Sequence, residues 1–224
     1  MRQATNQKAG RARILVVEDH ASLRAGLALM IGEEEGFSVC GDVGDAPSAL
    51  EAAQKLQPDL VLFDITLEKV VRVDLIPEFH RRAPGTRVLV LSAHPPHLYA
   101  RRCLDAGALG YVDKLESFKD VVRAIRAVLR GRVFVKGDRT ANDEEIWSAA
   151  RMKPVALDSL SNRELQIFMM IGMGKSARDV SDALALSLNT VEAHRENIRR
   201  KFGLSSAEEV LCYAVIWVNC RGIG

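Results

Sequence analysis

The sequence has few aromatic residues, few cysteines and no long apolar run. Aromatic residues make up 5% of the 224 residues, and there are four cysteines, none of them in a CxxC pair. This pattern predicts reduced thiols in a cytoplasmic protein. No segment approaches the roughly 20 apolar residues that span a bilayer, and the polar N-terminus has no apolar signal core. We therefore expect no membrane partner.

An excess of one charge is also absent. The chain has 31 Lys and Arg against 29 Asp and Glu, which gives a formal net charge of +2. Global electrostatics therefore indicate no particular partner. The hydrophobic fraction of 48% is ordinary for a protein with buried cores, and the length suggests one or two domains.

The sequence does contain apolar, strand-like runs that end in polar residues. Four such runs are the segments 14–17, 60–63, 87–91 and 109–112. The polar residues after them include Glu18, Asp19, Asp64, Ser92 and Lys114. Apolar runs of this kind are typical of strands buried on both faces of a parallel sheet, where ligands gather beyond the carboxyl ends of the strands. We therefore expect these five polar residues at one site.

The chemistry of these five side chains favours a divalent cation and a phosphoryl group. Three carboxylates form a hard oxygen site suited to Mg²⁺, and the cation relieves their mutual repulsion. Ser92 can donate a hydrogen bond to an incoming phosphoryl group, and Lys114 supplies a positive charge.

Helical patterns alternate with the strand-like runs in the first 130 residues. The predicted helices are 22–35, the segment between Asp45 and Pro58, 77–82, 96–106 and 118–129, and a further strand is predicted at 37–40. This alternation predicts a doubly wound α/β fold with a five-stranded parallel sheet.

Residues 13–130 resemble the receiver domain of two-component response regulators. The resemblance implies that Asp64 accepts a phosphoryl group from a partner sensor histidine kinase. The implied Mg²⁺ ligands are Glu18, Asp19, Asp64 and the main-chain carbonyl of Thr66. The implied phosphate-binding and switch residues are Ser92, Lys114 and Tyr111, the last expected to rotate inward.

The loop after Asp64 departs from the receiver pattern. Many receivers have two glycines here, but residues 67–74 read Leu-Glu-Lys-Val-Val-Arg-Val-Asp, with Lys69 and Arg72 in place of the glycines. Glycine would permit positive φ angles and close approach of the main chain to the site. The loop either packs locally or forms a surface for a partner, and the sequence leaves both open.

Polar segments precede and follow the predicted receiver domain. Residues 1–12 are predicted to form a flexible tail. Residues 131–157 are predicted to form a linker, with one short helix around 144–151.

From residue 158 onward the patterns predict a small all-α domain. Ser161 with Glu164 and Ser176 with Asp179 are capping signals for two short helices. A longer polar helix is predicted from 189 to 202, and an apolar one from 206 to 218. Two short helices, a tight turn and a longer polar helix are typical of a helix-turn-helix.

Segments 160–164 (LSNRE) and 189–198 (NTVEAHRENI) resemble the LuxR-type DNA-binding domain. With the receiver, the whole chain resembles response regulators of the NarL/FixJ class, which implies binding to double-stranded DNA. The implied base-facing residues are Glu192, Ala193 and Glu196. Other implied DNA contacts are Lys175, Asn189, Thr190, Arg195, Asn197, Arg199, Arg200 and Lys201. Residues 158–224 have eight cationic and eight acidic side chains, so we expect modest affinity with real sequence preference.

The last predicted helix has two interpretations. Tyr213 and Trp217 belong either to the dimer face of a homodimer that forms when the protein is active, or to the core.

The sequence therefore predicts a phosphorylation-controlled transcriptional regulator, the alternative being a regulator whose DNA binding does not depend on phosphorylation. An enzyme is disfavoured. Aspartate-nucleophile phosphatases usually have a second Asp where this chain has Thr66, and no GxGxxG follows the first strand.

Overall fold

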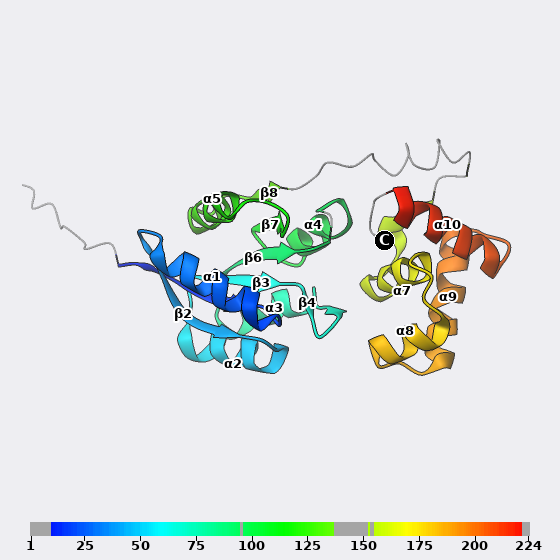
Figure 1. The fold of residues 1–224 in the computed structure, drawn as a ribbon, viewed down its shortest axis with the longest axis horizontal. Helices are drawn as coiled ribbons and strands as arrows, with labels where there is room; N and C mark the ends of the chain where they lie inside the picture. Colours follow the sequence, from blue (N-terminus) through cyan, green and yellow to red (C-terminus); the bar gives the residue numbers. More distant parts are fainter. Residues whose placement is uncertain (1–9, 95, 137–151, 153–154, 221–224) are drawn as a thin grey trace, which may run out of the picture. The chain divides into compact units, whose positions relative to one another are not determined.

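The computed structural model describes residues 10–94, 96–136, 152 and 155–220. The chain forms two compact units, Met1–Asp138 and Arg139–Gly224. Figure 1 shows the helices and strands of each unit. The predicted helix at 144–151 and most of the predicted tail lie outside the described residues. No helix among the described residues is long and apolar enough to cross a membrane.

A parallel sheet forms the centre of the first unit. Its strands are β1 (Ala12–Val17), β2 (Phe37–Val43), β3 (Leu60–Asp64), β6 (Arg87–Ser92), β7 (Gly110–Asp113) and β8 (Phe134–Lys136). Their order in the sheet is β2-β1-β3-β6-β7-β8, and every neighbouring pair is parallel. The doubly wound α/β prediction is confirmed, but the sheet has six strands rather than five.

Five helices connect these strands. They are α1 (Ala21–Glu33), α2 (Ala46–Leu56), α3 (Leu75–Arg82), α4 (Pro96–Asp105) and α5 (Phe118–Leu129). The Asp45 side chain accepts a hydrogen bond from the Ser48 main-chain N–H and so caps α2, with Pro47 in its first turn. Ser117 caps α5 in the same way through the Asp120 N–H.

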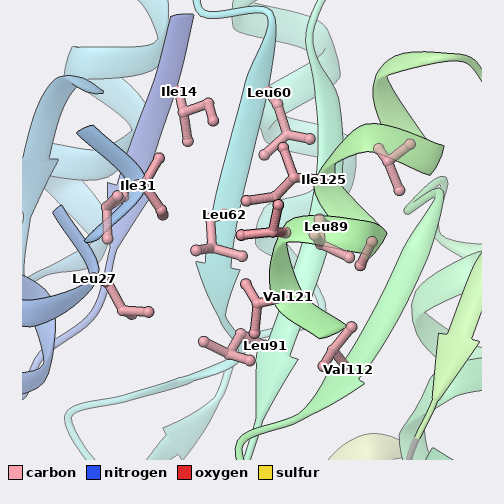
Figure 2. Close-up of a cluster of buried hydrophobic side chains, with 14 of the residues drawn as sticks. Ile14, Leu27, Ile31, Leu60, Leu62, Leu89, Leu91, Val112, Val121 and Ile125 are labelled. Carbon is pink, nitrogen blue, oxygen red and sulfur yellow. The ribbon is translucent and has the colours of Figure 1, made fainter. Parts of the chain in front are cut away.

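Strand β3 is buried on both faces, as the apolar run predicted. Leu60 and Leu62 belong to a core cluster that also includes Ile31 of α1 and Ile125 of α5. Figure 2 shows these side chains converging from the sheet and the two helices. Phe63 makes an edge-to-face ring contact with Phe79 of α3. Every residue from Leu60 to Asp64 is buried. The strand is therefore held firmly enough to fix the position of its last residue, Asp64.

The unexpected strand β8 lies in the segment predicted as a linker. It pairs with β7 in the register Gly110–Phe134, Tyr111–Val135 and Val112–Lys136. Lys136 Nζ lies 2.7 Å from Asp120 Oδ2 and 3.2 Å from Glu116 Oε2, which ties the strand to α5 and the loop before it. Three residues with an exposed Val135 carry too little hydrophobic pattern to predict a strand from sequence.

The second unit is all-helical. After a 3-10 turn at Leu157–Ser159 come α7 (Asn162–Gly172), α8 (Ala177–Leu184), α9 (Leu188–Phe202) and α10 (Ala207–Cys220). Both predicted capping boxes are present, at Ser161 with Glu164 and at Ser176 with Asp179. Helix α9 is capped by Ser187 and ends at Gly203, whose φ of 63° permits the left-handed turn.

The core of the second unit includes the two aromatic residues of α10. Tyr213 is 6% exposed and Trp217 is fully buried, and the Phe168 ring contacts the rings of Phe202 and Trp217. The prediction that Tyr213 and Trp217 form a dimer face is therefore wrong. Helix α10 is apolar on more than one side, so its periodicity could not identify the side that packs inward.

Candidate functional site

The carboxyl ends of β1 and β3 bring two buried carboxylates together. The parallel register pairs Val17 with Phe63, so Glu18 and Asp64 follow on adjacent strands. Glu18 is 1% exposed and Asp64 is 3% exposed. Burying two like charges side by side is unfavourable unless a positive charge lies between them.

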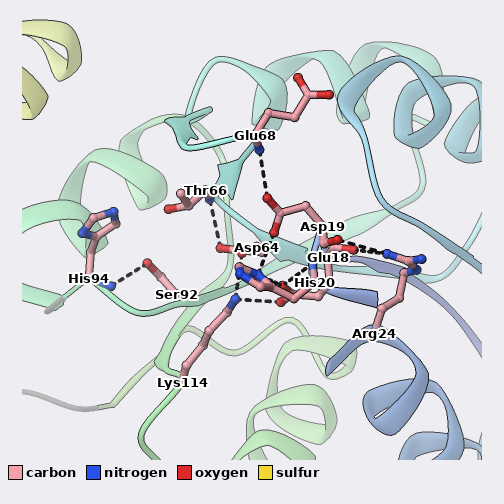
Figure 3. A network of polar contacts seen from close by, with 10 residues as sticks. All are labelled: Glu18, Asp19, His20, Arg24, Asp64, Thr66, Glu68, Ser92, His94 and Lys114. Atoms are coloured by element: carbon pink, nitrogen blue, oxygen red, sulfur yellow. Dashed lines mark hydrogen bonds and ion pairs between the residues drawn. The ribbon is translucent and has the colours of Figure 1, made fainter. Parts of the chain in front are cut away.

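Lys114 supplies that positive charge. Its Nζ lies 2.7 Å from Glu18 Oε2 and 2.7 Å from Asp64 Oδ2, as Figure 3 shows. Burial lowers the pKa of Lys114, but its hydrogen bonds and charge interactions with both carboxylates outweigh that effect and raise the pKa above its ordinary value. Lys114 is therefore a fixed cation at the centre of the site.

Asp64 remains a poorly stabilised anion even beside Lys114. Burial is the main cause that raises its pKa to about 6, and the negative charge of Glu18 adds to this. The Lys114 ammonium and the Thr66 N–H, which donates to Asp64 Oδ1 at 2.9 Å, act in the opposite direction. A further cation at this site would favour the ionised carboxylate.

Asp19 and His20 complete the acidic side of the site. The Glu68 main-chain N–H donates to Asp19 Oδ2 at 3.0 Å. His20 Nδ1 lies 2.9 Å from Asp19 Oδ1 and 3.1 Å from Glu18 Oε1. Sequence reasoning did not identify His20 or the Glu68 N–H. His20 directly follows the acidic pair, which is the one signal in the sequence that could have drawn attention to it.

The donor atoms fit a hard divalent cation. The side chains of Glu18, Asp19 and Asp64 offer carboxylate oxygens from two strand ends, and Glu18 Oε2 is paired with the Lys114 ammonium. Carboxylate oxygens with remaining coordination capacity are the ligands that Mg²⁺ prefers. Thr66, the fourth predicted ligand, lies beside Asp64 and contacts it through its N–H.

Ser92 is the last residue of β6 and Tyr111 is the second residue of β7, and both are fully buried. Ser92 Oγ accepts a hydrogen bond from the His94 N–H at 3.0 Å, and the Tyr111 hydroxyl donates to the His94 carbonyl at 2.7 Å. Burial is the main cause that lowers the pKa of His94 to about 4, with Lys114 adding to it. Tyr111, expected to turn inward on activation, already points inward in this structure.

The loop after Asp64 forms a small hairpin. Its strands are β4 (Thr66–Leu67) and β5 (Val70–Val71), which pair in antiparallel fashion. The turn residues Glu68 and Lys69 have φ angles of 52° and 66°, the left-handed region that glycine would occupy without strain. Leu67 and Val71 are buried. These contacts agree with local packing of the loop, the first of the two alternatives.

On helix α9, the exposed side presents the three predicted base-facing residues. Glu192, Ala193 and Glu196 are exposed, as are Asn189 and Arg200. Two of these acidic side chains pair within the helix. Arg195 Nη1 lies 3.1 Å from Glu192 Oε1, and Arg199 binds Glu196 through two nitrogens at 2.7 and 2.8 Å. Each pair joins residues three positions apart, a spacing at which side chains are neighbours on a helix.

The other predicted DNA contacts have different surroundings. Lys201 Nζ lies 2.6 Å from Glu164 Oε2 and donates to the Ser159 carbonyl at 2.9 Å, so it holds the start of α7. Arg200 donates to the side chain of Asn197.

Two further predicted contacts lie near the ends of helices. Thr190 lies in the first turn of α9 with its hydroxyl 2.8 Å from Ser187 Oγ. Lys175 is exposed after α7.

Comparison with known proteins matches both units. Residues 14–126 match the family of the response regulator receiver domain, and residues 158–214 match the luxR family of bacterial regulatory proteins. The transcription regulator of virulence factors BvgA of Bordetella pertussis is 32% identical over 89% of this chain and 94% of its own length. The response regulator GacA of Pseudomonas aeruginosa is 31% identical over 91% of this chain and 95% of its own.

Solved structures show the same architecture. A LuxR-family two-component response regulator from Aurantimonas is 30% identical, with a TM-score of 0.53 over 56% of this chain and 89% of that chain. RcsB from Salmonella enterica, solved on the rprA promoter with BeF₃⁻, has a TM-score of 0.58 at 17% identity, over 92% of this chain and 99% of that chain. The families and relatives are those of transcriptional regulators, which are not enzymes. The chain therefore belongs to the NarL/FixJ class of two-component response regulators, with a receiver domain followed by a LuxR-type DNA-binding domain.

Proposed function

We propose that phosphorylation of Asp64 by a sensor histidine kinase controls the binding of this transcription factor to double-stranded DNA. Glu18, Asp19, Asp64 and the Thr66 carbonyl would hold the Mg²⁺ that this reaction uses. The main observation behind the proposal is the Lys114 ammonium, 2.7 Å from both buried carboxylates of Glu18 and Asp64. An ammonium held beside a buried acid can compensate the negative charge that a phosphoryl group would add there.

The chain's own residues prepare Asp64 for attack. Thr66 N–H and Lys114 Nζ each bind one carboxylate oxygen and so fix the plane of the carboxylate. One oxygen of Asp64 forms a bond to phosphorus while the bond between phosphorus and the imidazole nitrogen of the kinase breaks. Mg²⁺ held by Glu18, Asp19 and Asp64 would supply positive charge for the transferring oxygens. Lys114 and the Ser92 hydroxyl are proposed to bind the new phosphoryl oxygens.

The hydroxyl of Ser92 links this event to the loop after β6. In the unmodified chain, Ser92 Oγ accepts the His94 N–H while Tyr111 holds the His94 carbonyl. When Ser92 donates to a phosphoryl oxygen, its position relative to His94 changes, and Tyr111 follows through the same residue. Such a local charge event can bias a two-state element of the domain.

DNA reading is assigned to the exposed side of α9. Glu192 and Glu196 can accept hydrogen bonds from cytosine amino groups, and Ala193 can contact a thymine methyl group. Contacts to the DNA backbone are proposed for Lys175, Asn189, Thr190 and Arg200, together with Arg195, Asn197 and Arg199. Lys201 is assigned to phosphate contact only through the family pattern, because it already binds Glu164.

The active form is proposed to be a homodimer. Since Tyr213 and Trp217 are buried, the dimer face on α10 is reassigned to its exposed residues Leu211 and Cys212. RcsB has been described as dimers bound to DNA, which supports this assembly for a related fold.

Labelling and footprinting test the proposal together. Wild type should be phosphorylated by acetyl phosphate with Mg²⁺, whereas Asp64→Asn should not, as measured by phosphate-affinity gels. Equal labelling of both proteins would show that Asp64 is not the acceptor.

A second candidate function is DNA binding that is independent of phosphorylation, and the buried Tyr111 of the unmodified chain favours it. Beryllofluoride with Mg²⁺ should tighten footprints on genomic fragments under the first candidate. Unchanged footprints would favour the second.

A further inference from the structure

Arg24, in the first turn of α1, lies behind the acidic pair rather than on its carboxylates. Its Nη1 donates to the main-chain carbonyl of Glu18 at 2.7 Å and lies 3.5 Å from that of Asp19. Figure 3 shows the side chain reaching this turn. The described part of the chain contains no ion pair between Arg24 and a carboxylate. A guanidinium that binds only carbonyl oxygens orients the main chain and leaves the carboxylates available.

The peptide groups on both sides of Glu18 are held. Its N–H donates to the Val43 carbonyl at 3.0 Å, and its carbonyl accepts from Arg24. These two bonds fix the main-chain direction at the point where β1 ends. The Glu18 and Asp19 side chains extend from this main chain, so their direction depends on it.

Gly44 provides the space for the guanidinium. A Cβ atom at position 44 would lie 2.9 Å from Arg24 Nη1 and 3.6 Å from the Glu18 carbonyl oxygen. The φ angle of Gly44 is outside the left-handed region, so alanine is compatible with the backbone. Gly44→Ala would therefore act by displacing Arg24 and by no other contact within 3.4 Å.

We propose that Arg24 is a positioning residue for the divalent-cation site and that Gly44 supplies the room it requires. The inference rests on the proposed function, in which Glu18 and Asp19 bind Mg²⁺. Groups that orient metal ligands commonly change metal affinity by about 10–100-fold when they are removed.

Binding of Mn²⁺ to the full chain, measured by the loss of its free electron paramagnetic resonance signal, tests the proposal. Arg24→Met and Gly44→Ala should each weaken binding about tenfold. Arg24→Lys should weaken it less, because an ammonium can still donate one hydrogen bond to the Glu18 carbonyl. Gly26→Ala in α1, whose Cβ would meet nothing within 4 Å, is the matched control and should bind as wild type does.

The double variant tests whether Gly44 acts through Arg24. If both changes remove the same contact, Arg24→Met with Gly44→Ala should bind about as weakly as either single variant. A loss that multiplies, to about a hundredfold, would overturn the link between the two residues.

Two further measurements separate the possible failures. The unfolding temperature without metal should change little in Arg24→Lys and Gly44→Ala. If this temperature falls in proportion to the loss of Mn²⁺ affinity, Arg24 contributes only general stability and the proposal is overturned. If Arg24→Met does not fold, Gly44→Ala decides. Wild-type affinity in Arg24→Met, with weakened binding in Glu18→Gln, overturns the role of Arg24 alone. No Mn²⁺ binding to wild type, or equal binding to Glu18→Gln, overturns the proposed function itself.

Discussion

Asp64 combines deep burial with a charge that its surroundings only partly compensate. Its pKa of about 6 lies above the ordinary value of 3.8, mainly because of burial. Between about pH 4 and pH 6 the folded protein therefore binds a proton that the unfolded chain has lost. Through this group, stability rises as the pH falls across that window and is lowest above pH 6.

Asp64→Asn removes this unfavourable charge. Without divalent cations at pH 7.5, we expect the variant to be more stable than wild type by about 1–3 kcal/mol. The difference should shrink toward pH 4, where wild type is protonated. Thermal unfolding followed by circular dichroism from pH 4 to pH 8 measures it. A variant that is less stable than wild type at pH 7.5 would contradict the interpretation.

Lys69 adopts a backbone conformation that disfavours side chains with a Cβ atom. Its φ of 66° is left-handed. Lys69→Gly should stabilise the first unit by about 0.5 kcal/mol, because relief of the steric strain exceeds the extra freedom of glycine in the unfolded chain. Lys69→Val, with a branched Cβ, should destabilise it by about 1 kcal/mol. Urea denaturation measures both, and the opposite order of stability would show that the turn is not strained.

The sequence identified the site residues that act through charged side chains at strand ends, but not those that act through the main chain or a loop. Glu18, Asp64 and Lys114 were predictable because each charged side chain ends or follows an apolar run. His20, Glu68 and Arg24 contribute through a loop imidazole, a main-chain N–H and contacts to carbonyls. Contacts of that kind depend on backbone geometry, which residue type and spacing do not specify.

Helices α7 and α10 pack at a distance that requires a glycine. A Cβ at Gly172 would lie 2.8 Å from the Ala214 carbonyl carbon and 2.5 Å from Val218 Cγ2. Backbone atoms of a neighbouring helix cannot move as a flexible side chain can. The contact therefore fixes how closely the two helices approach.

Gly172→Ala should destabilise the second unit by about 1–3 kcal/mol. Trp217 is buried in the second unit and residues 1–138 contain no tryptophan, so tryptophan fluorescence during thermal unfolding reports on the second unit. Gly26→Ala in α1 is the matched change without a clash, and it should stabilise the first unit by up to about 1 kcal/mol. Equal effects of the two substitutions would show that the α7–α10 contact is not tight.

At the level of elements, the sequence predicted what periodicity and capping determine. The strand ends, both capping boxes and helix α9 agree with the structure. Strand β8 was missed because only three residues form it. The inward side of α10 was left open because Tyr213 and Trp217 lie on a helix that is apolar on several sides. In both cases tertiary packing decides what local pattern leaves open.

Across the whole molecule, charge is balanced rather than concentrated. The net charge is +2, and the α9 cations Arg195, Arg199 and Lys201 all have acidic partners, two on α9 and one on α7. Few cations are then left to release counterions from DNA, so specific contacts rather than charge should dominate binding.

Salt titration of DNA binding tests this balance. The slope of log K against log salt concentration should be shallow, about −2 per bound copy. Glu196→Gln, which frees Arg199 for a phosphate, should make the slope steeper by up to about 1. Electrophoretic mobility shifts from 50 to 300 mM salt measure both. A wild-type slope steeper than about −5 per copy would contradict the expected pairing.

Strand β8 also covers the outer edge of β7, which would otherwise be free to pair with another strand. The edge is already occupied, and the new edge offers the backbone of three residues, the last of them a lysine held by Asp120. Short, charged borders of this kind resist annealing with a foreign strand. On that side of the domain, self-association has to proceed through helical surfaces, and fibril-like stacking of sheets from separate molecules is disfavoured.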